Sequence, residues 1–118
     1  MREGAAKLSL VRRQVGDVLV VDLVGNLVVG PEATLMREEM EKALATGRSR
    51  VLINLARVQY MDSTGIGVLL AAKTSAIHRK VQLKVCCVPS FVARLLAQLQ
   101  LTKILDVCEQ ESTALESF

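Results

Sequence analysis

The sequence predicts a single α/β domain with a mostly parallel sheet that carries an antiparallel edge. Three observations support this fold class. The chain has 118 residues, of which 51% are hydrophobic, so it can bury one core but is too short for two. Two adjacent extended segments come first, and short apolar strands then alternate with amphipathic helices. Strands that alternate with helices pair in parallel through right-handed crossovers.

The two opening segments predict a β-hairpin. Residues 7–13 alternate in polarity, and residues 18–24 are nearly all apolar and β-branched. Residues 14–17 between them have the composition of a turn. Gly25-Asn26 is then expected to break the second strand.

A first helix is predicted from Pro31 to Ala45, because proline is favoured at the first helical position. Its apolar face is formed by Leu35, Met36, Met40, Ala43 and Leu44. A short buried strand follows at Val51–Leu55, and a loop through Tyr60-Met61-Asp62 leads to the next helix.

The second half of the chain continues the alternation. A helix is predicted over residues 63–79, with Ile66, Leu69, Leu70 and Ile77 at helical spacing. The remaining elements are a strand at 83–88, a helix at 90–99, a strand at 104–107 and a short terminal helix from 109. The prediction is therefore a four- to five-stranded mixed sheet with three to four helices packed on it.

Composition excludes several classes of function. The formal charge of +3 is small, and the aromatic residues are only Tyr60, Phe91 and Phe118, which argues against nucleic-acid binding. No apolar run reaches the ~18 residues of a membrane span, and the N-terminus lacks the apolar core of a signal peptide. We therefore expect a cytoplasmic protein with no membrane span.

The cysteines are expected to be reduced thiols. Three cysteines, with Cys86 and Cys87 adjacent, do not form a disulfide framework. In an extended segment the side chains of these two neighbours would point to opposite faces of the sheet.

The sequence contains no recognisable catalytic constellation. His78 is the only histidine and lies among charged residues at a helix end. One histidine and three dispersed cysteines give no zinc spacing, and no Gly-rich phosphate-binding loop is present. We expect no enzymatic activity, no metal site and no cofactor.

The most informative stretch is Tyr60–Gly67, which joins a buried strand to an amphipathic helix. Asp62 or Ser63 is suited to cap the helix, because each can accept hydrogen bonds from free backbone N–H groups. Gly65 and Gly67 are not required for capping, and each costs about 1 kcal/mol relative to alanine inside a helix. They indicate that another group must approach the backbone closely.

This stretch resembles the signature of the STAS domain, and specifically that of bacterial anti-sigma factor antagonists. The resemblance covers about residues 8–110 of a single domain spanning 1–118. It includes Leu23–Leu27, which is similar to the small turn after the family's second strand. It also includes Val51–Leu55 with Val58 before the signature, and Pro89–Leu101 with Lys103–Leu105 after it.

The resemblance implies a phosphorylation-controlled switch. Family members bind a serine kinase that doubles as an anti-sigma factor, and so release the sigma factor that it holds. The kinase phosphorylates the serine that aligns with Ser63, with Thr64 as a second candidate acceptor, and a metal-dependent phosphatase of the PP2C type reverses the modification. Asp62, Thr64, Gly65 and Gly67 are implied to frame the docking surface.

Val28 is placed on the same surface and occupies a position at which the family commonly carries an acidic residue. Residues 28–31 are expected to lie beside the phosphorylation site, and the protein to be a monomer or weak dimer. Three other functions remain open at this stage. They are a non-switching STAS scaffold or transporter-accessory module, a small-ligand or nucleotide-binding domain, and a weak enzyme.

Overall fold

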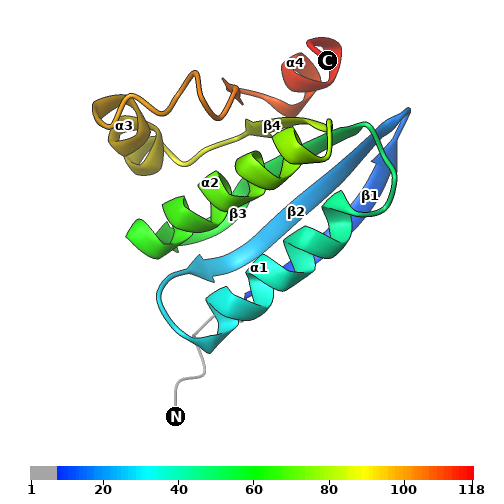
Figure 1. Cartoon of the computed structure of the whole chain (residues 1–118). Coiled ribbons are helices and arrows are strands. Elements are labelled where there is room, and N and C mark those ends of the chain that lie inside the picture. The colour runs from blue at the N-terminus through cyan, green and yellow to red at the C-terminus, as the bar shows by residue number, and fades with distance from the viewer. Residues whose placement is uncertain (1–7) are drawn as a thin grey trace.

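A computed structural model of the chain describes residues 8–118 and contains one five-stranded sheet with strand order β1-β2-β3-β4-β5 (Figure 1). The elements are β1 (Ser9–Val15), β2 (Val18–Leu27), α1 (Pro31–Leu44), β3 (Arg50–Met61), α2 (Ser63–His78), β4 (Gln82–Cys86), α3 (Ser90–Gln98), β5 (Val107–Cys108) and α4 (Glu111–Glu116). β1 is antiparallel to β2, and all other neighbours are parallel. The predicted mixed sheet with an N-terminal hairpin is confirmed. Lys7, the first residue of the predicted hairpin, lies outside the described residues.

The hairpin turns through two residues, Gly16 and Asp17, because Val15 already pairs with Val18. Gly16 has φ of 60°, which is the left-handed conformation that such tight turns require and that glycine adopts without strain.

The predicted break at Gly25-Asn26 is wrong, because β2 continues to Leu27 through a bulge. Gly25 has φ of 114°, and the β2–β3 register shifts on both sides of it. The predicted loop at Tyr60-Met61 is also wrong, since β3 continues to Met61 and pairs there with Leu27. Burial of Met61 in the core keeps this end of β3 extended. The two long strands therefore end together at the first turn of α2.

α1 and α2 lie side by side on one face of the sheet (Figure 1), where they cover the main hydrophobic core. Its members from these two helices are Met36, Met40, Ala43 and Leu44 of α1, and Ile66, Val68, Leu69, Ala72 and Ala76 of α2, and α3 adds Val92 and Leu96. Two predicted core residues lie outside it, because Leu35 is 58% exposed and Ile77 is 65% exposed. Each is adjacent in sequence to a buried residue. Because a helix rotates by about 100° per residue, the side chain next to a buried one points away from the core.

The second face of the sheet is covered at one end by α4. Val18, Val20, Leu52, Cys86 and Ala114 form a smaller buried cluster there. A polar network surrounds this cluster. The Arg13 guanidinium donates to Asp22 at 2.6 Å and to Glu111 at 2.6 Å, and Asn54 also donates to Glu111 at 2.8 Å. The network joins α4 to β1, β2 and β3.

The last two strands are displaced from their predicted limits. β4 ends at Cys86 because Cys87 adopts a left-handed conformation with φ of 59°. Cys87 therefore packs against the same small cluster as Cys86, and the two side chains do not lie on opposite faces of the sheet. β5 begins only at Val107, because Leu105 is buried and Asp106 has φ of 51°.

Candidate functional site

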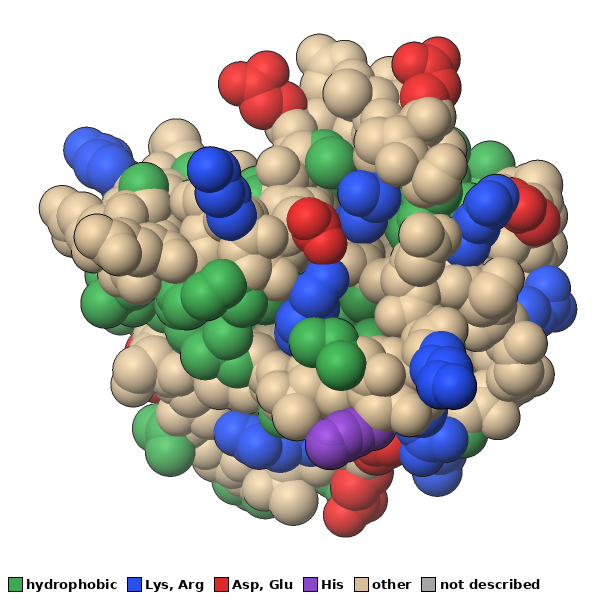
Figure 2. All heavy atoms as spheres, turned by 45° about the horizontal axis from the view of Figure 1, so that its top comes forward, with side chains coloured by type: hydrophobic (Ala, Val, Ile, Leu, Met, Phe, Trp, Pro, Cys, Tyr) green, Lys and Arg blue, Asp and Glu red, His purple; other side chains and the backbone are tan. Residues whose placement is uncertain are grey.

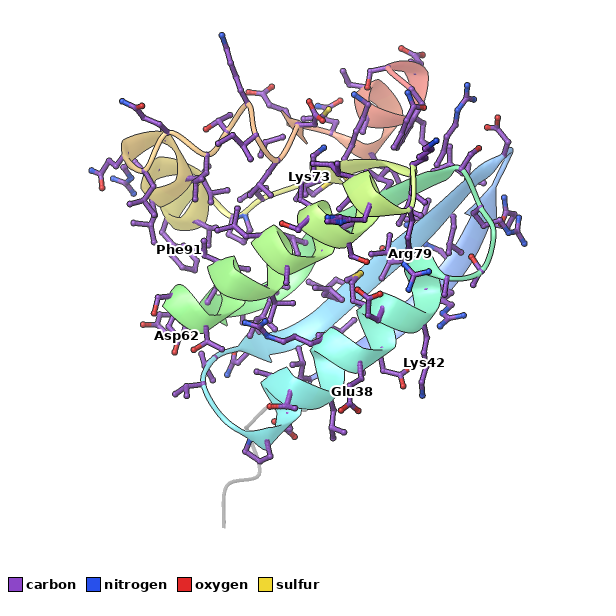
Figure 3. The ribbon with its side chains drawn as sticks, viewed as in Figure 1. Glu38, Lys42, Asp62, Lys73, Arg79 and Phe91 are labelled. Atoms are coloured by element: carbon purple, nitrogen blue, oxygen red, sulfur yellow. The ribbon has the colours of Figure 1, made fainter. Side chains whose placement is uncertain are left out.

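Asp62 connects the first turn of α2 to the loop between β2 and α1 (Figure 3). Its backbone is extended, and its Oδ1 accepts a hydrogen bond from the backbone N–H of Thr64 at 2.8 Å. Its Oδ2 accepts from the backbone N–H of Val29 at 3.1 Å. Of the two predicted capping residues, Asp62 is the cap, and one carboxylate thus joins two segments far apart in the sequence.

The same hydrogen bonds stabilise the charge of this carboxylate. The Val29 N–H, followed by that of Thr64, lowers the pKa of Asp62 below its ordinary value. The first turn of α2 therefore already carries a negative charge at neutral pH.

Ser63 is the first residue of α2, and its side chain is exposed. Within the described part of the chain its hydroxyl forms no hydrogen bond, because Asp62 provides the cap. Thr64, the second candidate acceptor, is half-buried. Ser63 is therefore the more accessible hydroxyl of the two.

Gly65 is buried against the ends of β2 and β3. A Cβ atom on Gly65 would lie 2.7 Å from the Leu27 carbonyl oxygen and would overlap Cγ of Met61. The close approach that the sequence indicated at this glycine is made by the chain's own strands. Gly65 thus allows the first turn of α2 to sit directly on the sheet.

Gly67 faces a different neighbour. A Cβ atom at this position would lie 3.2 Å from Nη2 of Arg37, which reaches across from α1. Arg37 lies on the exposed side of α1, and no sequence motif distinguishes it. Only the packing of α1 against α2 brings it to Gly67.

The loop that Asp62 holds presents an apolar residue beside Ser63. Val29 is 75% exposed, whereas the predicted docking residue Val28 is half-buried. Gly30 follows with φ of 147°, and Pro31 begins α1. The hydrogen bond from Val29 to Asp62 agrees with the expectation that residues 28–31 lie beside the first turn of α2.

A second apolar feature lies at the end of β3. The rings of Tyr60 and Phe91 stack with their centroids 6.0 Å apart and an interplanar angle of 14°. Both rings are exposed, and Phe91 comes from α3 (Figure 3). Figure 2 shows hydrophobic side chains gathered on the left of the view, the side on which α3 lies in Figure 1. No local sequence pattern distinguishes Phe91, because the stacking joins residues from different elements.

Residues 8–118 contain no group of three or more histidine, cysteine, aspartate or glutamate side chains that could hold a metal ion. His78 is exposed at the end of α2. All three cysteines are free thiols, and burial raises the pKa of Cys86 above its ordinary value. No helix in this part of the chain is long and apolar enough to cross a membrane.

Comparison with known proteins identifies the family. The sequence model of the STAS domain matches residues 9–114. The chain belongs to the STAS domain family. A STAS relative, the anti-sigma F factor antagonist of Paenibacillus polymyxa, is 31% identical over 99 residues, which cover 83% of this chain and 84% of that protein.

Solved structures share the STAS fold. A crystal structure from Thermotoga maritima matches with a TM-score of 0.80 and 22% identity, covering 92% of each chain. The anti-sigma factor antagonist SpoIIAA in its unphosphorylated form matches with a TM-score of 0.74 and 18% identity, covering 92% of this chain and 95% of that chain. Phosphorylated SpoIIAA from Bacillus matches with a TM-score of 0.70 and 17% identity, covering 92% and 98%. At these identities the likeness establishes the fold alone.

Proposed function

We propose that this STAS protein is a bacterial, cytoplasmic anti-sigma factor antagonist that is inactivated when Ser63 is phosphorylated. Its partner is an anti-sigma factor with serine-kinase activity, and a PP2C-type phosphatase restores the active form. The observation that carries the proposal is an exposed Ser63 hydroxyl at a helix start that Asp62 already caps. The relative from Paenibacillus polymyxa, named an anti-sigma F factor antagonist, supports it. The existence of SpoIIAA in both unphosphorylated and phosphorylated forms supports it further.

The modification needs no catalytic group from this chain. The kinase transfers the γ-phosphoryl group of its ATP to Oγ of Ser63, ADP leaves, and the hydroxyl proton passes to a base of the kinase. Ser63 is suited to this role because its hydroxyl is exposed and makes no internal hydrogen bond within residues 8–118.

Phosphorylation would change the surface much more than the fold. The phosphoryl group adds a charge of about −1.5 to −2 and three acceptor oxygens. Val29 and the Tyr60–Phe91 pair expose apolar surface near Ser63, which suits a partner interface. Burying a dianion in such an interface costs several kcal/mol, and a loss of about 4 kcal/mol weakens binding about a thousandfold.

The first turn of α2 disfavours the nucleotide-binding alternative. Free N–H groups at a helix start can bind phosphate, but here Asp62 accepts the Thr64 N–H and adds a negative charge. A non-switching scaffold or transporter-accessory module would use the same surface without phosphorylation, so the test must separate these two functions.

The test compares Ser63→Ala with Ser63→Asp in the full chain. We expect the alanine variant to retain the kinase partner and to resist inactivation by ATP. The aspartate variant should keep its fold but bind the kinase at least about a hundredfold more weakly, because it places a charge in the interface. Pull-downs from the source cell followed by calorimetry with the purified kinase measure both effects.

Ser112→Asp is the matched control, because it places the same charge near the start of the distant helix α4, where Ser112 is exposed. It should bind like the unmodified chain. Thr64→Ala tests the second acceptor and should still be phosphorylated. Equal binding of the kinase by Ser63→Ala and Ser63→Asp would contradict the switch and favour a constitutive scaffold.

A further inference from the structure

We propose that Arg37 of α1 is the internal counter-ion of the phosphoryl group on Ser63. The inference rests on the proposed function, because it concerns the phosphorylated state of that serine. It assigns a role to a residue outside the Tyr60–Gly67 motif. The phosphoryl group would be held across α1 and α2 by the chain's own guanidinium.

The helix geometry places the two groups on one surface. Gly67 follows Ser63 by four positions in α2, and residues with this spacing lie on the same face with Cβ atoms about 5–6 Å apart. Nη2 of Arg37 lies 3.2 Å from the position that a Cβ of Gly67 would occupy. A phosphoryl group extends several ångströms beyond Cβ, so a rotation of the long arginine side chain brings the two into contact.

The charge of Arg37 is available for this role. Salt bridges within residues 8–118 are formed by Arg13, Lys42, Arg50, Lys73 and Arg79, and Arg37 takes part in none of them. The nearest acidic neighbour at helical spacing is Glu41, whose carboxylate pairs with Arg79 at 2.8 Å. Arg37 is exposed, and it can reorient without breaking an ion pair of the described chain.

The first turn of α2 creates a need for such a cation. Three of its backbone N–H groups are already used, because Thr64 donates to the Asp62 carboxylate while Gly65 and Ile66 donate to the Asp62 carbonyl oxygen. The charged Asp62 carboxylate also repels a phosphoryl group on the next residue. The phosphoryl group therefore either displaces the Asp62 carboxylate or pairs with a cation from another element.

A guanidinium is well matched to the phosphoryl group. It is planar, is always charged, and can donate two parallel N–H···O bonds to phosphate oxygens. Pairing with Arg37 would leave Asp62 bonded to Val29 and so preserve the loop between β2 and α1. The phosphorylated protein would then keep its fold while presenting a bulkier group to the kinase, and this group would still be negative because one arginine offsets only part of a charge of about −1.5 to −2.

The experiment encodes phosphoserine at position 63 during synthesis and follows it by ³¹P NMR titration. The second pKa of phosphoserine is about 6 in water, and a nearby cation lowers it because it favours the dianion. We expect Arg37→Gln to raise this pKa by about half a unit or more relative to the unmutated phosphoprotein. Arg37→Lys should restore part of the effect, because it retains a charge but donates no bidentate pair.

Arg48→Gln is the matched control, since Arg48 is exposed in the loop after α1, at the opposite end of α2 from Ser63. It changes the net charge equally and should leave the phosphoserine pKa unchanged. The same phosphoserine pKa in the Arg37→Gln and unmutated phosphoproteins would overturn the inference. An equal rise of this pKa in Arg37→Gln and Arg48→Gln would also overturn it.

Neither result depends on a kinase. Failure of the proposed function would appear separately, as kinase binding that does not distinguish Ser63→Ala from Ser63→Asp.

Discussion

The two sides of the first turn of α2 differ in what they contact. On the inner side, Gly65 is buried and lies against Leu27 and Met61. On the outer side, Ser63 is exposed and Gly67 meets only the flexible end of Arg37. Neighbouring residues of one short motif therefore serve different purposes. Gly65, together with the cap Asp62, builds the junction between sheet and helix, and the outer side stays accessible, as the proposed modification of Ser63 requires.

Gly65→Ala should produce the largest effect, because its Cβ would meet a backbone carbonyl oxygen that cannot move without shifting β2. We expect the free energy of unfolding to fall by about 3 kcal/mol, at the upper end of typical overpacking costs. Urea unfolding followed by circular dichroism measures this loss. Unchanged stability would show that the inner side tolerates a side chain, and the contrast between the two sides would disappear.

Asp62→Asn should have the next largest effect, and one that depends on pH. The folded state lowers the pKa of Asp62, so its carboxylate contributes stability that is fully present above the unfolded value of about 3.9. This contribution is lost as the pH falls through the lower folded pKa. The variant should therefore be less stable than the unmutated chain at neutral pH, and the difference should shrink below about pH 4.

Urea midpoints measured from pH 7 to pH 3 test this expectation. Glu41 and Glu111 also have lowered pKa values, but they titrate in both proteins, so the difference between the two curves isolates Asp62. The exchange rate of the Val29 amide hydrogen provides a local measurement, and it should rise in the variant. A stability difference that stays constant with pH would mean that the charge of Asp62 does not hold the loop.

Most of the fold could be predicted from the sequence, because its elements follow local patterns. Pro31 begins α1 as expected, and α2 begins at Ser63. The errors occur where pairing between distant segments overrides the local pattern. Gly25 suggested a break, but the partner strand β3 accommodates it as a bulge. β4 ends because Cys87 has a left-handed backbone conformation. The residues around Cys87 have no turn-forming composition that would predict this.

The candidate site could be predicted only in part, for the same reason. Asp62, Ser63 and Gly65 lie within four consecutive residues, so the motif identified them. Arg37 and Val29 belong to other segments. The family resemblance predicts residues 28–31 beside Ser63, and the Val29–Asp62 hydrogen bond agrees with this, but nothing in the sequence indicates that Arg37 reaches α2 from α1. Their contribution depends on the relative placement of whole elements, and a single sequence carries no direct signal of that placement.

Gly67→Ala should have the smallest effect on stability, and it tests the outer side most directly. The new methyl group would contact only Nη2 of Arg37, which can move away at little cost. Alanine is favoured over glycine in a helix by about 1 kcal/mol, so the free energy of unfolding should stay unchanged or rise by up to this amount.

The methyl group of Gly67→Ala should nevertheless displace the guanidinium from the surface next to Ser63. In the phosphoserine-63 protein, Gly67→Ala should therefore raise the second pKa of the phosphoserine, as Arg37→Gln does, without loss of stability. A variant that unfolds as readily as Gly65→Ala would show that the outer side is as tightly packed as the inner side.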